Sequence, residues 1–132
     1  MRVVLDTNIL LAGIATHGLC EALLTLCYRD HTVVLSEYII DELRSHYAGK
    51  FKAAPEQVEE VCHFFRSQSE LVVPAPVIMP DFEDPDDLPV LGTAIAGKAE
   101  CLVTGDQALQ TIKEFQGVRV FSPRAFYDRL RQ

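Results

Sequence analysis

The sequence predicts a single domain of the α/β class, a three-layer α/β/α fold with a central parallel β-sheet. Short β-branched runs typical of buried strands alternate with stretches whose apolar residues recur at helical spacing. With 132 residues, 48% of them hydrophobic, the chain has the size of one domain with one core. Because crossovers between parallel strands are right-handed, helices are expected on both faces of the sheet. We therefore interpret residues 1–132 as one domain.

The first half of the chain is expected to form a β-α-β unit, then two helices and a third strand. β-branched and apolar runs predict strands at residues 2–6, 31–35 and 71–73. One amphipathic helix is expected between the first two strands, because apolar residues from Cys20 to Tyr28 lie three and four positions apart. Ser36 is expected to cap a helix through Tyr47, and a further helix follows Pro55.

The second half of the chain continues the alternation of helices and strands. Strands are expected at residues 101–104 and 118–120. A helix ending near Gly97 precedes the first of these strands, and a short helix begins at Gln107. Ser122 is expected to cap a last helix, with Pro123 at its first position. These expectations place the strand ends, and the residues that follow them, at one edge of the sheet.

The cysteines and histidines argue against a zinc site. The four cysteines have no C-x-x-C spacing, and the four histidines never pair at a zinc-binding spacing. We interpret the cysteines as buried, reduced thiols of a cytoplasmic protein. The longest apolar run, from Ile9 to Ala15, is much shorter than a membrane-spanning helix, so no membrane association is expected.

The charge of the chain restricts how it could bind nucleic acid. A net charge of −7 argues against non-specific binding to a polyanion, which normally needs a basic surface. The basic residues near the expected cleft are scattered: Arg44, Lys50, Lys52, Arg124, Arg129 and Arg131. Of these, Arg44 or Lys50 is the candidate to contact phosphate. A polyanionic substrate would therefore need a metal ion as a bridge.

Four acids are expected to meet at the carboxyl edge of the sheet. Asp6 ends the first strand, Glu42 lies in the helix after the second, Asp87 opens a helix, and Asp106 follows the fourth strand. Two carboxylates about 4 Å apart repel by roughly 4 kcal/mol at an effective dielectric constant near 20, so such a cluster calls for a cation. Each acid alone has a structural alternative, as a turn residue or helix cap.

Carboxylate ligands in an incomplete shell suit Mg²⁺ or Mn²⁺ better than zinc. Such ions can lower the pKa of a water molecule and stabilise a leaving oxygen, so phosphodiester hydrolysis would need no serine or cysteine nucleophile. The accessory candidates are polar residues beside the acids: Thr7, Asn8, Asp86 and Thr104. Asp86 is expected to cap the helix that Asp87 opens, and the reverse assignment, with Asp86 as ligand, stays open.

The order of these motifs resembles the PIN-domain ribonuclease family. The resemblance rests on Val-Val-Leu-Asp6-Thr-Asn-Ile-Leu, Asp41-Glu42-Leu, Asp86-Asp87-Leu-Pro-Val-Leu and Leu-Val-Thr104-Gly-Asp106, which span nearly the whole chain. The Asp-Pro-Asp-Asp87 and Thr-Gly-Asp106 forms are similar to the branch that contains toxins of bacterial toxin–antitoxin systems. Two departures are Gln107, where many relatives carry a charged residue, and the absence of an obvious basic patch.

The resemblance implies a metal-dependent endoribonuclease in which Asp6, Glu42, Asp87 and Asp106 bind Mg²⁺ or Mn²⁺. It also implies RNA as substrate, a homodimer, and a separately encoded antitoxin that covers the site. One alternative is a non-catalytic PIN-like module that binds RNA or protein. A receiver domain fits poorly, because it needs an acid pair after the first strand. An aspartyl phosphatase would need a second carboxylate where Asn8 stands, since Asn8 cannot transfer a proton.

Overall fold

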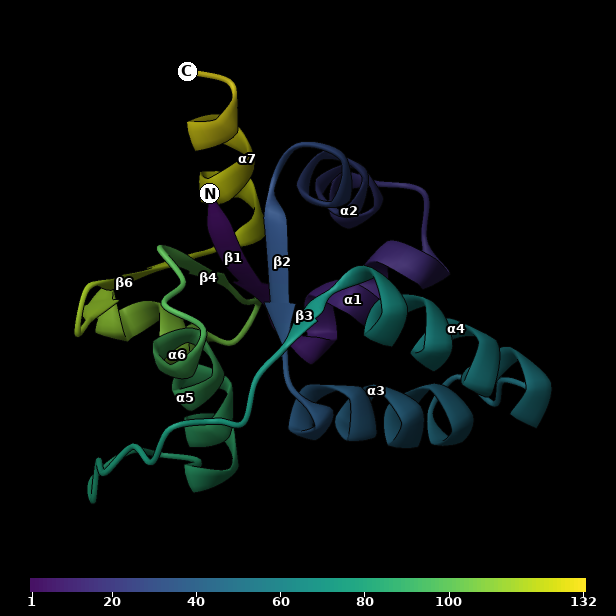
Figure 1. Cartoon of the computed structure of the whole chain (residues 1–132), viewed down its shortest axis with the longest axis horizontal. Helices are drawn as coiled ribbons and strands as arrows, with labels where there is room; N and C mark the ends of the chain where they lie inside the picture. Colours follow the sequence, from purple (N-terminus) through teal and green to yellow (C-terminus); the bar gives the residue numbers. More distant parts are fainter.

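A computed structural model describes all 132 residues. Its six-stranded sheet has the order β3-β2-β1-β4-β6-β5 (Figure 1). The strands are β1 (Arg2–Leu5), β2 (Thr32–Leu35), β3 (Glu70–Leu71), β4 (Cys101–Val103), β5 (Glu114–Phe115) and β6 (Val118–Phe121). All neighbours are parallel except β5, which runs antiparallel to β6 at the sheet edge. The mostly parallel sheet confirms the predicted fold class.

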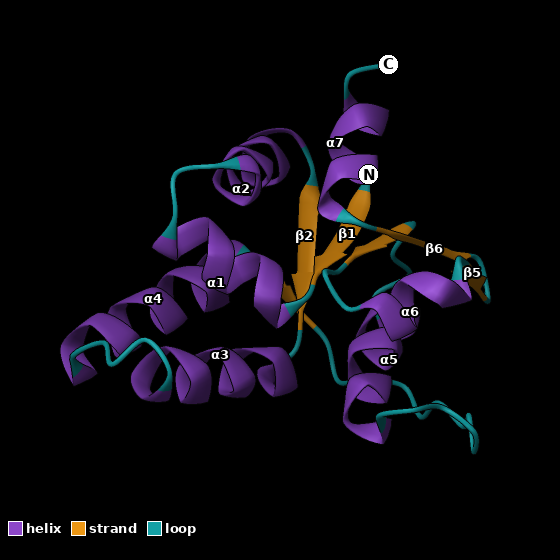
Figure 2. Cartoon of the chain, turned by 180° about the vertical axis from the view of Figure 1, so that it is seen from behind, coloured by secondary structure: helices purple, strands orange, loops and turns teal.

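Seven α-helices and one 3-10 turn connect and cover the strands. They are α1 (Thr7–Ala15), α2 (Leu19–Asp30), α3 (Glu37–Gly49), α4 (Pro55–Gln68), η1 (Pro85–Asp87), α5 (Leu88–Ala96), α6 (Gln107–Ile112) and α7 (Pro123–Leu130). The crossover from β1 to β2 and that from β3 to β4 run in opposite directions across the sheet. Right-handed connections therefore place α2 and α5 on opposite faces. α7 packs against α2 and β6, and α6 packs against β6 (Figure 2).

The strand register aligns the carboxyl ends of the three central strands. Leu5 at the end of β1 pairs with Val103 at the end of β4, which in turn pairs with Phe121 at the end of β6. The residues that follow these strands therefore leave the sheet at one edge, where ligands bind in open α/β sheets. This register brings Asp6 and Thr104 side by side although they are far apart in sequence.

The core contains very few polar side chains, and most of those lie at this same edge. Twenty-eight hydrophobic residues form one buried cluster that includes the whole apolar part of β1. The buried polar residues are Asp6, Thr7, Ser36, Thr93 and Thr104. Ser36 and Thr93 satisfy each other, because the Thr93 Oγ1 donates to Ser36 Oγ at 2.8 Å. The other three belong to the predicted site.

Several local predictions hold, and their physical reasons are visible. The Ser36 hydroxyl accepts from the Ile39 amide at the start of α3, and the Ser122 hydroxyl accepts from the Ala125 amide at the start of α7. Gly97 caps the end of α5 as expected. All four cysteines are free, and three are buried, although Cys20 is only half-buried.

Other predictions were wrong in detail. Two helices, not one, connect β1 and β2. α1 was not predicted, because it is apolar on nearly all sides and lacks the amphipathic period that marks α2. The third strand is Glu70–Leu71 rather than residues 71–73, and Val73 is 86% exposed. β5 was not predicted, and it makes the sheet mixed rather than wholly parallel.

No single helix is long and apolar enough to span a membrane. Taken together, α1 and α2 have the length and composition for it, but a bend of 108° separates them.

Gly92 on α5 provides a test of how this helix is held in place. A Cβ built there would lie 2.2 Å from the carbonyl oxygen of Ala75, whose amide also donates to the Gly92 carbonyl at 3.0 Å. Gly92→Ala should therefore lower the free energy of unfolding by about 1–3 kcal/mol, measured by urea denaturation. Gly49→Ala is the matched control, since nothing lies within 4 Å of its Cβ position. Equal stability of the two variants would contradict the close packing of α5 on this loop.

Candidate active site

Asp6 lies at the centre of the site, at the end of the central strand β1. Its side chain is 4% exposed and caps α1 by accepting from the Thr7 amide at 2.7 Å. The other carboxylate oxygen accepts from Thr104 Oγ1 at 2.7 Å and from Asn8 Nδ2 at 3.4 Å. Burial raises the pKa of Asp6, and the hydrogen bonds from Thr104 and Thr7 oppose this shift. The carboxylate is thus held rigidly in a place where a negative charge is costly.

Thr104 connects Asp6 to Asp106. While its hydroxyl donates to Asp6, the same oxygen accepts from the Asp106 amide at 3.0 Å. Asp106 then caps α6, because its carboxylate accepts from the Ala108 amide at 2.8 Å. Asn8 adds a second link, since its Oδ1 accepts from the Gly105 amide at 2.9 Å. The loop after β4 is therefore fixed to the start of α1 by side chains.

Glu42 on α3 approaches the same edge from the side of β2. Its carboxylate accepts from Thr7 Oγ1 at 3.2 Å, and Thr7 itself is buried. The pKa of Glu42 is raised by its partial burial and by the negative charges of Asp6, Asp86 and Asp84, and it is lowered by the bond from Thr7. Thr7 thus lies between two acids, bonded to Asp6 through its amide and to Glu42 through its hydroxyl.

Asp87 and Asp106 are in direct contact through a hydrogen bond between their carboxyl groups. Burial, the bond to Asp106 and the charges of Asp106, Asp6 and Asp84 raise the pKa of Asp87 to about 8. The same bond lowers the pKa of Asp106, because protonated Asp87 donates to it. Without a cation, the repulsion between the two carboxylates therefore favours a proton on Asp87.

Asp86 does not play the capping role expected of it. Asp84 instead accepts from the Asp86 amide at 3.0 Å and caps the η1 turn, and no side-chain bond caps α5. Asp86 is exposed, and its backbone carbonyl accepts a hydrogen bond from the Tyr38 hydroxyl. The turn fixes Asp87 at the start of α5 because Pro85 and Pro89 flank it.

Sequence reasoning missed two residues that support the site. Tyr38 lies one helical turn before Glu42 on α3 and holds the η1 turn through Asp86, and this spacing could have identified it. Burial and the charges of Glu42, Asp86, Asp87 and Asp84 raise the pKa of Tyr38 to about 12. Gln110 donates to the Thr104 carbonyl at 2.7 Å, a contact that no local pattern predicts.

Two of the four acids, Asp87 and Asp106, open to solvent at a polar depression of about 410 Å³. It is lined by Glu83, Asp84, Asp87, Asp106, Gln107 and Ala108. No group of three or more His, Cys, Asp or Glu side chains is arranged to hold one metal ion. The four acids are instead linked in pairs. The carboxyl groups of Asp87 and Asp106 interact with each other. Hydrogen bonds through Thr104 link Asp6 to Asp106, and hydrogen bonds through Thr7 link Asp6 to Glu42.

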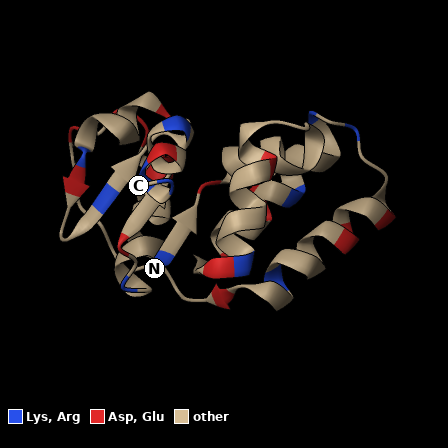
Figure 3. Ribbon diagram, turned by 90° about the horizontal axis from the view of Figure 1, so that it is seen from above, with Lys and Arg blue, Asp and Glu red and all other residues tan.

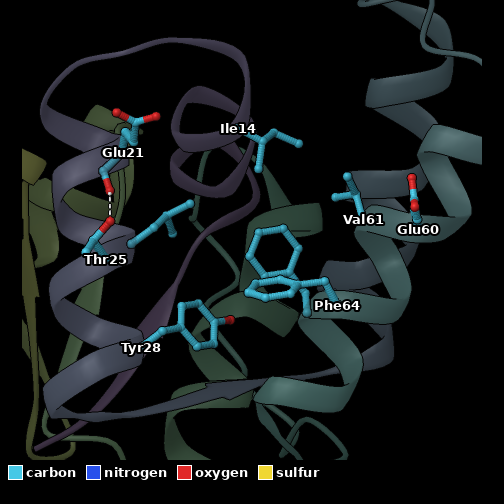
Figure 4. A pocket seen from close by; sticks show the side chains of 9 residues that line it. Ile14, Glu21, Thr25, Tyr28, Glu60, Val61 and Phe64 are labelled. Atoms are coloured by element: carbon cyan, nitrogen blue, oxygen red, sulfur yellow. Dashed lines mark hydrogen bonds between the residues drawn. The ribbon is translucent and has the colours of Figure 1, made fainter.

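A second hollow, of about 480 Å³, lies between α1, α2 and α4 and has a different character (Figure 4). Its walls are mainly apolar, with Ile14, Tyr28, Val61 and Phe64 turned toward the space. Two acids, Glu21 and Glu60, lie on its margin, and both are exposed.

Comparisons with known proteins support this reading of the fold. The profile of the PIN domain family matches residues 2–108. Among solved structures, a similar one is the crystal structure of VapBC2 from Rickettsia felis bound to a DNA fragment from their promoter. The two chains superpose with a TM-score of 0.64 and 22% identity, over 92% of this chain and 98% of that chain, which shows a shared fold. A comparison with curated proteins finds no match.

The matched range runs from β1 into α6 and includes all four acids of the site. The fold, the order of the motifs and the family profile agree. The chain belongs to the PIN domain family.

Proposed function

We propose that this chain is a metal-dependent endoribonuclease, the toxin of a toxin–antitoxin pair, and that residues 1–132 form its single nuclease domain. The observation that carries this proposal is the grouping of acids at one sheet edge: Thr104 bonds both the buried Asp6 and the amide of Asp106, and Asp106 lines one depression with Asp87. Two carboxyl groups in contact, with a third nearby, indicate that a cation belongs there. Members of the PIN domain family are generally nucleases that use divalent metal, which agrees with this reading.

The donor set fits Mg²⁺ or Mn²⁺, because its oxygens come from carboxylates and no thiol or imidazole is among them. Asp6, Glu42, Asp87 and Asp106 would hold the ion, which would have to draw these side chains closer together, because no three of them are arranged around one point in the structure. When bound, a divalent cation lowers the pKa of water and stabilises the charge that develops on phosphate. Thr7, Thr104 and Asn8 orient Asp6 by donating to its carboxylate. Asp86 contributes its carbonyl to the contact with Tyr38 that holds the η1 turn.

The partners follow from the same assignment. RNA is the proposed substrate, and a separately encoded antitoxin is the proposed protein partner. The structural similarity to the toxin–antitoxin complex VapBC2 supports an antitoxin. We also propose a homodimer located in the cytoplasm.

Cleavage should require both the acids and the metal. We expect purified protein to cut an unstructured or a structured RNA with Mg²⁺ or Mn²⁺ and not with EDTA. Asp6→Asn and Asp106→Asn should each lower kcat/KM by more than about 100-fold, because each removes a proposed ligand. Asp81→Asn is the control, since Asp81 is exposed in the loop before η1. Equal cutting by the Asp6 variant would identify a contaminant and favour a non-catalytic binding module.

Asp87→Asn should stabilise the metal-free protein. Asparagine is neutral without a bound proton, whereas Asp87 must take up a proton from solution to fold at neutral pH, so the free energy of unfolding in EDTA should rise by about 1 kcal/mol. An acid whose folded pKa is raised to about 8 binds its proton more tightly in the folded state, so wild-type stability should fall as pH rises from about 4 to 8. Urea denaturation across this pH range measures the difference.

Thermal denaturation with Mn²⁺ tests whether Asp87 binds a cation. Mn²⁺ should raise the Tm of the wild-type protein and leave that of Asp87→Asn nearly unchanged, because ligand binding to the folded state stabilises it. If Mn²⁺ raises both Tm values equally, or if Asp87→Asn is the less stable protein in EDTA, Asp87 is not part of a cation site.

A further inference from the structure

The positive charge that sequence reasoning placed near the acids lies elsewhere in the fold. Arg44, one of the two expected phosphate contacts, is paired with Asp41 and Glu59 at 2.8 and 3.1 Å. Arg129 and Arg131 were expected near the cleft, but both line a hollow of about 570 Å³ at another place on the molecule. This hollow takes no part in the site described above.

The hollow lies at the amino edge of the sheet, opposite the acids. Met1 precedes β1, His31 precedes β2, and both residues line the hollow. The end of α7 contributes another part of the wall, with Tyr127, Arg129 and Arg131. Figure 3 looks onto this edge from above, and both ends of the chain lie there. The hollow is therefore separate from the candidate active site.

Two guanidinium groups in this hollow have no anionic partner. Arg129 and Arg131 are exposed, and the ion pairs of the protein involve neither of them. The one acid in the wall, Asp30, already accepts two hydrogen bonds from Arg29, at 3.0 and 2.8 Å. The side chains of this wall therefore leave positive charge uncompensated, although the chain as a whole carries −7.

His31 and Tyr127 add polar and aromatic groups to the same wall. The Met1 nitrogen donates to Nδ1 of His31 at 3.1 Å, so Nε2 is the nitrogen that carries hydrogen in the neutral ring. Burial lowers the pKa of His31, which favours this neutral form. The guanidinium carbon of Arg131 is 5.6 Å from the centre of the Tyr127 ring, a contact that helps to hold the planar group at the wall.

The rest of the wall is apolar and leaves room for more than a small ion. Leu26 on α2 and Leu130 on α7 are half-buried and line the hollow together with the Tyr127 ring. A volume of about 570 Å³ falls within the range of about 300–1,000 Å³ that is typical of small-molecule sites. Such sites combine an apolar wall with a few polar groups, as this hollow does.

We propose that this hollow binds a phosphate group, either free phosphate or the phosphate of a mononucleotide. The N–H groups of a guanidinium match the oxygens of phosphate in pairs. The two unpaired arginines match a dianion, whereas a single carboxylate would leave one of them without a partner. The inference does not depend on the proposed nuclease function, because none of the four acids lines this hollow.

The test is isothermal titration calorimetry of the whole chain with phosphate, adenosine monophosphate, adenosine and acetate, in EDTA and at constant ionic strength. Without a cation the four acids repel anions, so binding there does not interfere. Phosphate and adenosine monophosphate should bind, adenosine should not, and acetate should bind at least about tenfold more weakly than phosphate. Tighter binding of the nucleotide than of phosphate identifies a nucleotide site, and equal binding identifies a site for the phosphate group alone. If neither binds, or if acetate equals phosphate, the proposal is overturned.

A charge-removing double variant locates the binding. Arg129→Gln/Arg131→Gln should weaken the binding of phosphate and of adenosine monophosphate at least about tenfold, because it removes the charge-assisted hydrogen bonds. Lys50→Gln/Lys52→Gln is the matched control, since it removes two exposed positive charges just after α3 and should bind as the wild type does. Equal binding of phosphate by the two double variants would place the anion elsewhere and overturn the proposal.

A conservative variant separates the loss of charge from any loss of local structure. Arg129→Lys/Arg131→Lys keeps both positive charges but lacks the paired N–H groups of arginine. It should therefore bind phosphate more tightly than the glutamine variant and more weakly than the wild-type protein. If the lysine variant binds no better than the glutamine variant, the arginines do not hold the anion through their charge, and the proposal fails.

Discussion

The site depends on one buried charge at the end of the central strand. Asp6 is 4% exposed, and its carboxylate receives hydrogen bonds from the amide of Thr7 and the side chains of Thr104 and Asn8. These bonds join β1, the start of α1 and the loop after β4, so the sheet edge is built around this group. Burial still raises the pKa of Asp6, which means that the bonds compensate for desolvation only in part. A protein that needed only a helix cap here would place serine or threonine at less cost.

The remaining acids increase this electrostatic strain. Asp87 and Asp106 are in contact, and the raised pKa of Asp87 shows that the folded chain cannot easily hold both charges. Both side chains are positioned by rigid local structure, Asp87 by the proline-flanked η1 turn and Asp106 by its cap on α6. The chain therefore holds repelling groups in place at a cost in stability. Such an arrangement is typical of a functional site that a cation completes.

Local patterns predicted most of the fold, and the exceptions have physical causes. Ser36 and Ser122 are caps whose chemistry is encoded within three residues, so both were identified correctly. α1 was not predicted, because a helix buried on nearly all sides lacks the amphipathic period. Asp86 was wrongly expected to be a cap, and Asp84 caps the preceding turn, because five acids in seven residues offer no local means of choosing among them. Tyr38 and Gln110 form hydrogen bonds to residues on other elements, which local patterns do not predict. The contacts of the arginines with Phe121 and Tyr127 also depend on tertiary packing.

The negative charge of the acid edge limits what it can bind on its own. Four acids at one sheet edge of a chain with net charge −7 repel a polyanion, so a polyanionic ligand could approach this edge only with a cation beside the acids. Because charges are screened beyond about 10 Å at moderate salt, one ion would act only on the groups next to it. The arginines of α7 do not supply this charge, because Arg129 and Arg131 line a hollow with Met1 and His31, which precede β1 and β2 at the opposite edge of the sheet.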